Sequence, residues 1–117
     1  CDLTPNAVGW SCTSDRNAKE NFIAVDSSDV LRRVNAMPIT WWNLKGADPS
    51  DKHIGPVAQD FQDTFGVGRE TTINTMDAQG IAFAAIQGLH RLVQEKDAQI
   101  AALASRVAAL ERQAHRR

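Results

Sequence analysis

Long apolar runs are missing from this 117-residue sequence. A membrane-spanning helix needs roughly 18 or more consecutive apolar residues, and no window of the sequence comes close to that length. The first residues also lack the charged start and apolar stretch of a secretory signal peptide. We therefore expect a soluble fragment of a longer protein, with no membrane partner.

An excess of charge of one sign is missing as well. The formal net charge is −1, and the sequence pI is about 6.3. Basic residues cluster only at Arg32–Arg33 and in the terminal run 115–117, and both clusters are too short to form a basic stripe. We expect no nucleic-acid partner.

Cysteine and histidine are scarce. The three histidines, His53, His90 and His115, are too scattered for a metal site, and there is no CxxC motif. We therefore expect no metal and no cofactor. The two cysteines, Cys1 and Cys12, either form a disulfide that closes only the leader or remain thiols in a reducing compartment.

The residues that are present divide into three unlike parts, and the length fits one domain with a modest core. Residues 1–13 contain Pro, Gly, Asn and Thr without a period, so we expect the looped or extended end of an upstream stalk. Residues 14–80 are expected to form a mixed α/β body, and residues 81–117 a long coiled-coil helix. The predicted fold class is α+β, a small domain of short strands and helices followed by a long C-terminal helix that forms a coiled coil.

Short elements are expected to alternate along the body. Apolar and β-branched runs predict strands over residues 21–26, 39–44 and 53–59, with a turn over 45–52. A helix over residues 26–37 is predicted to be capped by Asp26 or Ser27 and ended by Pro38. A second helix over residues 58–66 is predicted to end at Gly66.

The last part of the chain has the pattern of one long helix from Ala78 to about Gln113, with Asp77 as its cap. Apolar residues recur there at heptad positions a and d, and Lys96 is the one interruption. These seam residues are Ile86, Leu89, Val93, Ile100, Leu103, Val107 and Leu110. A lone helix has nowhere to bury such a stripe except against copies of itself, so the pattern predicts a homo-oligomer.

The alternative is a helix that folds back on its own small domain. β-branched residues at a with Leu at d favour a dimer, but the heptad pattern alone does not set the number of chains.

A serine and a lysine stand five residues apart in "SDRNAK", at Ser14 and Lys19. A serine hydroxyl becomes a nucleophile when a base takes its proton, and a desolvated lysine amine is a known base for this step. On a straight strand the two side chains would point to opposite faces. A turn at Asp15 and Asn17 would bring them together, although a surface turn is the commoner meaning of such a spacing.

Other candidate residues are weaker. Ser11 and Cys12 have no base nearby in the sequence, and His53 with Asp51 fits a turn better than an acid–base pair. Trp41 and Trp42 could stack on sugars or bases. At strand spacing, we expect instead that one tryptophan belongs to the core and the other to a subunit interface.

Four landmarks in order give the Ser–Lys pair more weight. They are "SDRNAKENF", "MPITWWNLK", "HIGPVAQDF" and "DAQGIAFAAIQGLHRLV". Together they resemble the self-cleaving C-terminal intramolecular chaperone domain of phage endosialidase tailspikes and tail fibres. Relatives of that domain also occur in transcription factors of the myelin regulatory factor type. The resemblance covers about residues 14–113.

This resemblance implies a serine autopeptidase in which Ser14 is the nucleophile and Lys19 the general base. It also implies a homotrimer that templates the folding of an upstream β-helical fibre of the same polypeptide and then cuts itself off. The protein would then be a tail fibre or tailspike precursor of a phage virion. It would assemble in the bacterial cytoplasm, and its chaperone part would be released on cleavage.

Two bonds remain open as the site of the cut. The resemblance implies the bond between Ser14 and Asp15. A hydroxyl that attacks its own carbonyl would close a four-membered ring, so this bond needs the hydroxyl of another chain. Attack on the carbonyl of Thr13 is an ordinary N-to-O acyl shift, so the Thr13–Ser14 bond is the rival.

Two further functions remain open beside the peptidase. The first is a trimerisation cap that does not cleave, in which Ser14 and Lys19 are structural. The second is a sugar-binding fibre tip that uses Trp41 and Trp42.

Overall fold

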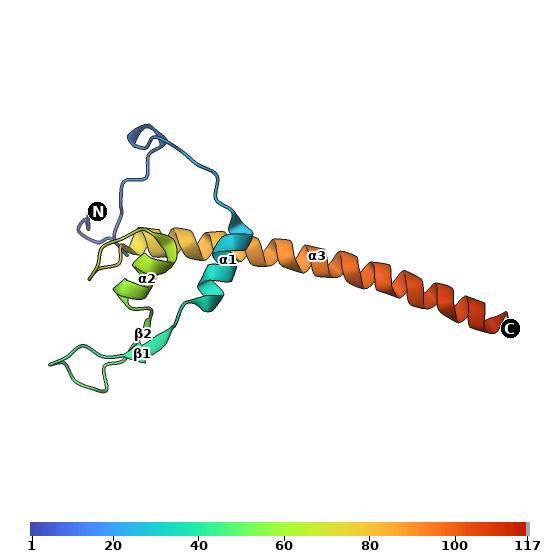
Figure 1. Cartoon of the computed structure of the whole chain (residues 1–117). Helices are drawn as coiled ribbons and strands as arrows, with labels where there is room; N and C mark the ends of the chain where they lie inside the picture. The colour runs from blue at the N-terminus through green and yellow to red at the C-terminus, as the bar shows by residue number, and fades with distance from the viewer. Residues whose placement is uncertain (117) are drawn as a thin grey trace.

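The computed structural model describes residues 1–116 (Figure 1). Its elements in chain order are η1 (Arg16–Ala18), α1 (Ser27–Ala36), β1 (Thr40–Trp42), β2 (His53–Gly55), α2 (Ala58–Phe65) and α3 (Thr75–His115). The predicted α+β class, a small mixed body with a long C-terminal helix, is confirmed. Residue 117, the last residue of the predicted coiled-coil segment, lies outside the described residues.

Helix α1 forms where the sequence predicts it. Of the two candidate caps, Asp26 takes the role, because its carboxylate accepts a hydrogen bond of 3.2 Å from the amide of Asp29. The residue before Pro38 cannot easily stay helical, and the helix accordingly ends with Ala36 and the C-cap Met37.

Helix α2 also matches its prediction. It ends at Gly66, whose φ of 68° belongs to the left-handed region that glycine adopts without strain. Phe61 is 2% exposed, and its ring lies 5.4 Å from that of Phe65. The guanidinium of Arg33 on α1 donates a hydrogen bond of 2.8 Å to the carbonyl of Thr64, which ties α1 to the last turn of α2.

Helix α3 begins earlier and ends later than predicted. The predicted cap, Asp77, is wrong, because the side chain of Asn74 accepts hydrogen bonds from the amides of Met76 (2.8 Å) and Asp77 (3.4 Å). Asn at the cap with Asp in the first turn satisfies two orphan amides and complements the helix dipole. With 41 residues, α3 is about 62 Å long.

The strands are shorter than the sequence suggests. Strands β1 and β2 pair antiparallel over three residues, with Thr40 opposite Gly55 and Trp42 opposite His53. The strand predicted over residues 21–26 is wrong, because that segment pairs with no strand among residues 1–116 and its first residue, Asn21, has a positive φ of 57°. An extended apolar segment becomes a strand only when another strand supplies its hydrogen bonds.

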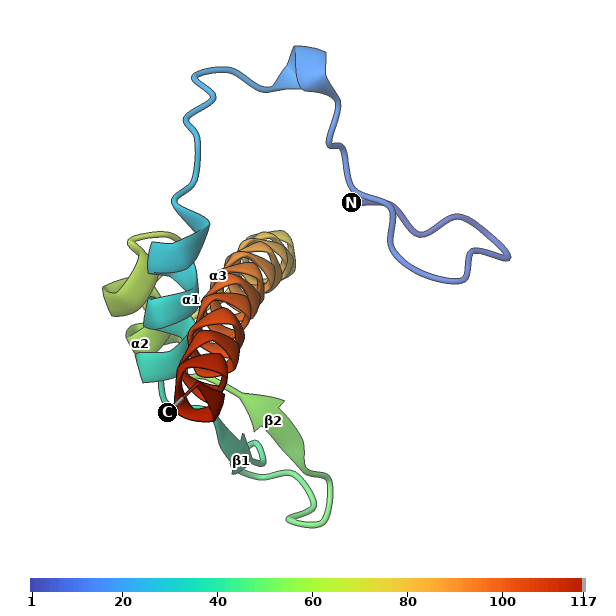
Figure 2. The ribbon, with the colours of Figure 1, turned by 90° about the vertical axis from the view of Figure 1, so that its right-hand side faces the viewer.

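Few side chains are buried in the chain. Within residues 1–116 the buried side chains are Ser27 on α1, Met37 at its C-cap, Phe61 on α2 and Ala85 on α3. Viewed along α3, Figure 2 shows the leader on the opposite side of this helix from α1 and α2. Residues 13–26 arch away from the body between the leader and α1 (Figures 1 and 2).

Candidate functional site

Ser14 and Lys19 lie on either side of η1, within this arch. The Lys19 Nζ donates a hydrogen bond of 2.6 Å to the Ser14 Oγ. Both residues are exposed in the single chain. The structure therefore brings together the two side chains that the sequence pattern singled out.

A short 3₁₀ turn between the two residues makes this contact geometrically possible. Asp15 caps η1 by accepting a hydrogen bond of 3.0 Å from the amide of Asn17. The amide of Ala18 then donates to the carbonyl of Asp15 (3.0 Å), and that of Lys19 to the carbonyl of Arg16 (3.3 Å). Asp and Asn favour turns through such local bonds. The turn reverses the side-chain parity of a straight strand.

The direction of the Ser14–Lys19 hydrogen bond bears on what the pair can do. In the single chain the Lys19 ammonium donates and the serine hydroxyl accepts. A general base must accept the hydroxyl proton, so the amine has to be neutral. Burial disfavours the charged form of a lysine, whereas water stabilises it.

Immediately after the pair, the chain exposes a short apolar segment. Phe22, Ile23 and Val25 are 67%, 87% and 65% exposed. Asn21 has a positive φ of 57°, which bends the chain between Lys19 and this segment. The sequence pattern marked the segment as a strand, and in the single chain it has no partner to pair with.

The seam residues of α3 are also uncovered. All seven, Ile86, Leu89, Val93, Ile100, Leu103, Val107 and Leu110, are between 48% and 64% exposed. The fold does not turn α3 back on the body along its second half (Figure 1). An apolar stripe of this length has no cover from the rest of residues 1–116.

One contact that the sequence analysis missed lies between α1 and α3. A Cβ built on Gly88 would come within 2.8 Å of the Ser27 carbonyl carbon and 3.1 Å of the Leu31 Cβ. Gly88 therefore lets the backbone of α1 touch α3. A glycine inside a helical pattern often has such a packing reason, and that signal was available in the sequence.

Among the remaining candidates, His53 lies beside both Asp51 and Trp42. The His53 Nε2 lies 3.9 Å from the Asp51 carboxylate, and the His53 ring stacks against Trp42 at 4.9 Å. Neither tryptophan is buried, since Trp41 is 69% and Trp42 38% exposed, so the expected core tryptophan is wrong for the single chain.

Across residues 1–116, no three His, Cys, Asp or Glu side chains are grouped to hold a metal ion. In the same residues, no helix is apolar enough over the needed length to cross a membrane.

Two carboxyl groups outside the Ser14–Lys19 pair have lowered pKa values. Hydrogen bonds from Arg33 and then Arg32 hold the pKa of Asp29 below its usual range. Hydrogen bonds from the backbone and then the side chain of Ser50 lower the pKa of Asp48. Asp29 bonds to two arginines of α1, and Asp48 bonds to Ser50 in the turn between the strands. Both pKa shifts therefore come from structural contacts.

A comparison with protein families finds a match for the part of the chain that begins at the Ser14–Lys19 pair. Residues 14–66 match the model of a family that is named as a peptidase and described as "chaperone of endosialidase". The match begins at Ser14 and contains η1, α1, both strands and α2. The comparison with curated proteins gives no match. The resemblance drawn from the sequence is therefore confirmed over residues 14–66, which match the chaperone of endosialidase family.

Proposed function

We propose that the chain is an intramolecular chaperone that assembles as a homotrimer, supports the folding of an upstream β-helical fibre, and then cuts itself off at Ser14. The family match over residues 14–66 supports the chaperone role. The observation that carries the self-cleavage is the 2.6 Å contact of Lys19 with Ser14. This contact involves Ser14, which is the first residue of the segment that matches the family. We place the protein in a phage tail fibre or tailspike precursor.

In the proposed reaction, the neutral Lys19 amine takes the proton of the Ser14 hydroxyl. The Oγ then attacks a carbonyl carbon, the C–N bond of the scissile peptide breaks, and the lysine returns its proton to the leaving nitrogen. Water hydrolyses the resulting ester, which gives a carboxylate and frees the serine.

At the Ser14–Asp15 bond, our first choice, the attacking hydroxyl comes from a neighbouring chain. At the Thr13–Ser14 bond, it comes from Ser14 of the same chain. The two routes leave products whose ends differ by one serine, so a mass measurement separates them.

Assembly is proposed to switch this reaction on. A water-exposed ammonium keeps its proton, and only burial favours the neutral amine that the reaction needs. Cleavage would then follow the folding of the trimer and its fibre, and loss of the chaperone would make the fibre kinetically stable.

The extent of the exposed surface supports an oligomer. A compact monomer of 12.8 kDa would expose about 6,300 Å², whereas this chain exposes 10119 Å². Its radius of gyration is 22.2 Å, against about 13 Å for a compact chain of this length. Obligate interfaces bury surface on this scale, roughly 2,000–5,000 Å². The choice of three chains over two comes from the family.

Three variants test the Ser–Lys assignment by intact mass and gel analysis of the purified protein. Ser14→Ala and Lys19→Ala should remain folded and oligomeric but uncut. Lys19→Arg should not restore the cut, because a guanidinium keeps its proton. Ser11→Ala is the matched control, since Ser11 is exposed in the leader and has no contact with Lys19. It should cleave like the unaltered chain. A Ser14→Ala protein that is still cut would show that another residue is the nucleophile.

A trimerisation cap that does not cleave is the second candidate. The exposed pair is equally compatible with this function, because a structural hydrogen bond would look the same in the single chain. Under this alternative the assembled protein keeps its full mass with Ser14 intact. The two functions therefore differ in a single mass measurement.

A further inference from the structure

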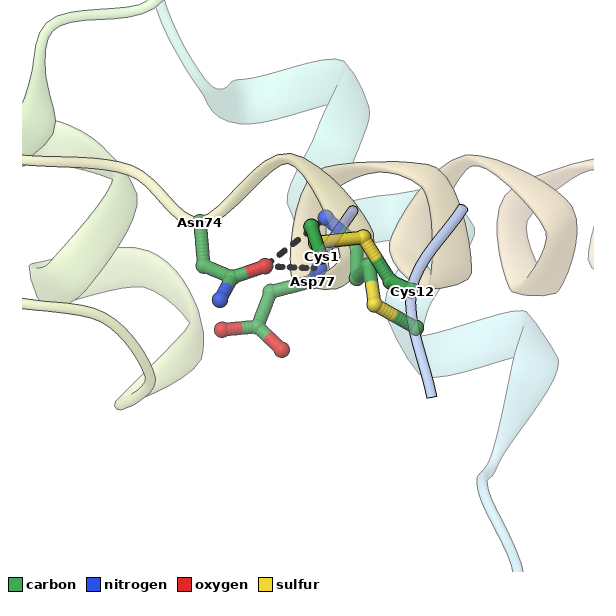
Figure 3. Close-up of a disulfide and its surroundings, with 5 residues drawn as sticks. Cys1, Cys12, Asn74 and Asp77 are labelled. Atoms are coloured by element: carbon green, nitrogen blue, oxygen red, sulfur yellow. Dashed lines mark hydrogen bonds between the residues drawn. A yellow bond between two sulfur atoms is a disulfide. The ribbon is translucent and has the colours of Figure 1, made fainter. Parts of the chain in front are cut away.

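Residues 1–12 form a closed hairpin that ends just before the proposed cut. Asp2 and Ser11 pair as an antiparallel bridge through two backbone hydrogen bonds of 2.7 and 2.9 Å. Next to this bridge, Cys1 and Cys12 form a disulfide (Figure 3). At the other end, the amide of Ala7 donates to the carbonyl of Thr4 at 3.0 Å. We call residues 1–12 the N-terminal hairpin.

The N-terminal hairpin is held by its own bonds. Within residues 1–116, each of its hydrogen bonds joins two of its own residues. All its residues are exposed except Cys12, which is partly buried. Its turn has local causes as well, because Pro5 fixes φ and Asn6 takes the positive φ of 68° that a type II turn requires. Asn74 and Asp77 lie in the surroundings of the disulfide (Figure 3), but none of these bonds depends on them.

Both candidate bonds of the cut lie on the C-terminal side of Cys12. The Thr13–Ser14 bond is the second peptide bond after Cys12, and the Ser14–Asp15 bond is the third. Cleavage at either therefore leaves the whole hairpin on the upstream product. The chaperone part, from residue 14 or 15 onward, keeps neither cysteine.

We propose that the N-terminal hairpin is a disulfide-locked clasp at the new C-terminus of the released upstream product. This inference rests on the proposed cleavage at Ser14. The clasp holds the last residues of the product folded back on themselves once the chaperone has left. A chain end that is tied down resists fraying and the proteases that start from free ends. Disulfides persist in oxidising surroundings, which a released fibre meets outside the cell.

The clasp acts on the product and not on the cut. The Ser14–Lys19 contact and the turn that makes it use residues 14–19 only. Opening the disulfide should therefore leave cleavage unchanged, while it frees the product end. This separates the clasp from a role in positioning the scissile bond.

The test uses the protein with its upstream fibre segment beside its Cys1→Ser/Cys12→Ser double variant. Both are allowed to cleave in buffer without reductant, and the upstream peptide is isolated and treated with a carboxypeptidase. Mass spectrometry should show a peptide lighter by two hydrogens than its reduced form. Digestion should remove the residues after Cys12 and then stop. In the double variant, the carboxypeptidase should remove the residues at positions 12, 11 and 10 at least about tenfold faster, because the open hairpin frays.

Each outcome bears on a separate part of the proposal. Equal digestion of the two peptides, or a peptide of reduced mass, would overturn the clasp and leave the cleavage intact. A cut in the double variant that is slower by more than about twofold would mean that the hairpin serves the cut, since a local turn should not feel its loss. Absence of any peptide would overturn the cleavage and the clasp together.

Discussion

At the scale of single residues, the Ser14–Lys19 pair depends on local geometry and on remote burial. The 3₁₀ turn over Arg16–Ala18 sets the 2.6 Å contact, so it forms in one chain. The proposed reaction also needs a neutral amine, which burial in the assembly would favour. Under the proposed function, the local turn therefore sets the geometry and assembly supplies the activation.

Asp29 gives a testable prediction at this scale. Its carboxylate accepts hydrogen bonds from Arg33, at 2.8 Å, and from Arg32 on α1. These lower the pKa of Asp29 below its ordinary value of 3.8. A carboxyl with a lowered folded pKa stabilises the fold above its ordinary value, and this contribution is lost as the pH falls through the lowered one.

Asp29→Asn should therefore lower the melting temperature at neutral pH, and the difference should vanish in acid below the lowered pKa. The pair is exposed, so we expect a fall of about 2 °C or less. Thermal melts of both proteins across the acid range check this. A difference that grows as the pH falls would contradict the assigned role.

At the scale of elements, α1 and α3 pack through a point of backbone contact. Gly88 is that point, because any side chain there would meet the Ser27 carbonyl carbon and the Leu31 Cβ. Ser27 is 4% exposed, and its hydroxyl is buried without a hydrogen-bond partner in the described residues. Close contact between the two backbones excludes water from this hydroxyl.

Two alanine substitutions in α3 should therefore act in opposite directions. Gly88→Ala forces α1 off the helix, and overpacking of this kind costs about 1–3 kcal/mol. At Gly80 a Cβ would meet nothing within 4 Å. Gly80→Ala should then stabilise the protein by about 0.5–1 kcal/mol through helix propensity.

Chemical denaturation followed by circular dichroism measures both changes. Equal effects of the two substitutions would contradict the packing of α1 on Gly88.

The sequence predicts those elements whose causes are local. Caps, breakers and heptad spacing gave α1, α2 and the long helix, and Gly66 ended α2 as expected. The turn that joins Ser14 to Lys19 was also foreseeable, because Asp15 and Asn17 favour it by themselves. The cap of α3 was misassigned because Asn74 and Asp77 both suit a helix start, and only the backbone conformation decides between them.

Elements with non-local causes could not be predicted in this way. Residues 21–26 have the composition of a strand, but pairing depends on a neighbour that the single chain does not supply. The contact of Ser27 with Gly88 joins residues far apart in the sequence, and a glycine signals a packing reason without naming its partner.

At the scale of the whole molecule, the chain is an open shape with extents of 75 × 43 × 33 Å. Three unpartnered apolar features share it: the segment after Lys19, the seam of α3, and a groove of about 380 Å³ between α1, α2 and α3. The groove is lined in part by Val30, Phe65, Met76 and Ile81. Assembly of several copies is proposed to cover these features together.

A charge placed in the seam should therefore take the assembly apart. Leu103→Asp puts a carboxylate at a d position, where a buried unpaired charge is strongly unfavourable. Ser105→Asp is the matched control, because Ser105 lies two residues on at position f and is exposed. Sedimentation velocity should give monomers for Leu103→Asp and trimers for Ser105→Asp. The Leu103→Asp protein should also stay uncut, since the pair would remain in water. A cleaving monomer would separate the peptidase from assembly.

The most direct test of the central claim is the intact mass of the freshly expressed protein with its upstream fibre segment, measured beside its Ser14→Ala variant. We predict that the unaltered protein yields two products that meet at Ser14–Asp15 or at Thr13–Ser14, whereas the Ser14→Ala variant keeps its full mass. A full-length mass for the assembled, unaltered protein would contradict self-cleavage and leave a trimerisation cap. A break at any other bond would contradict the assignment of Ser14.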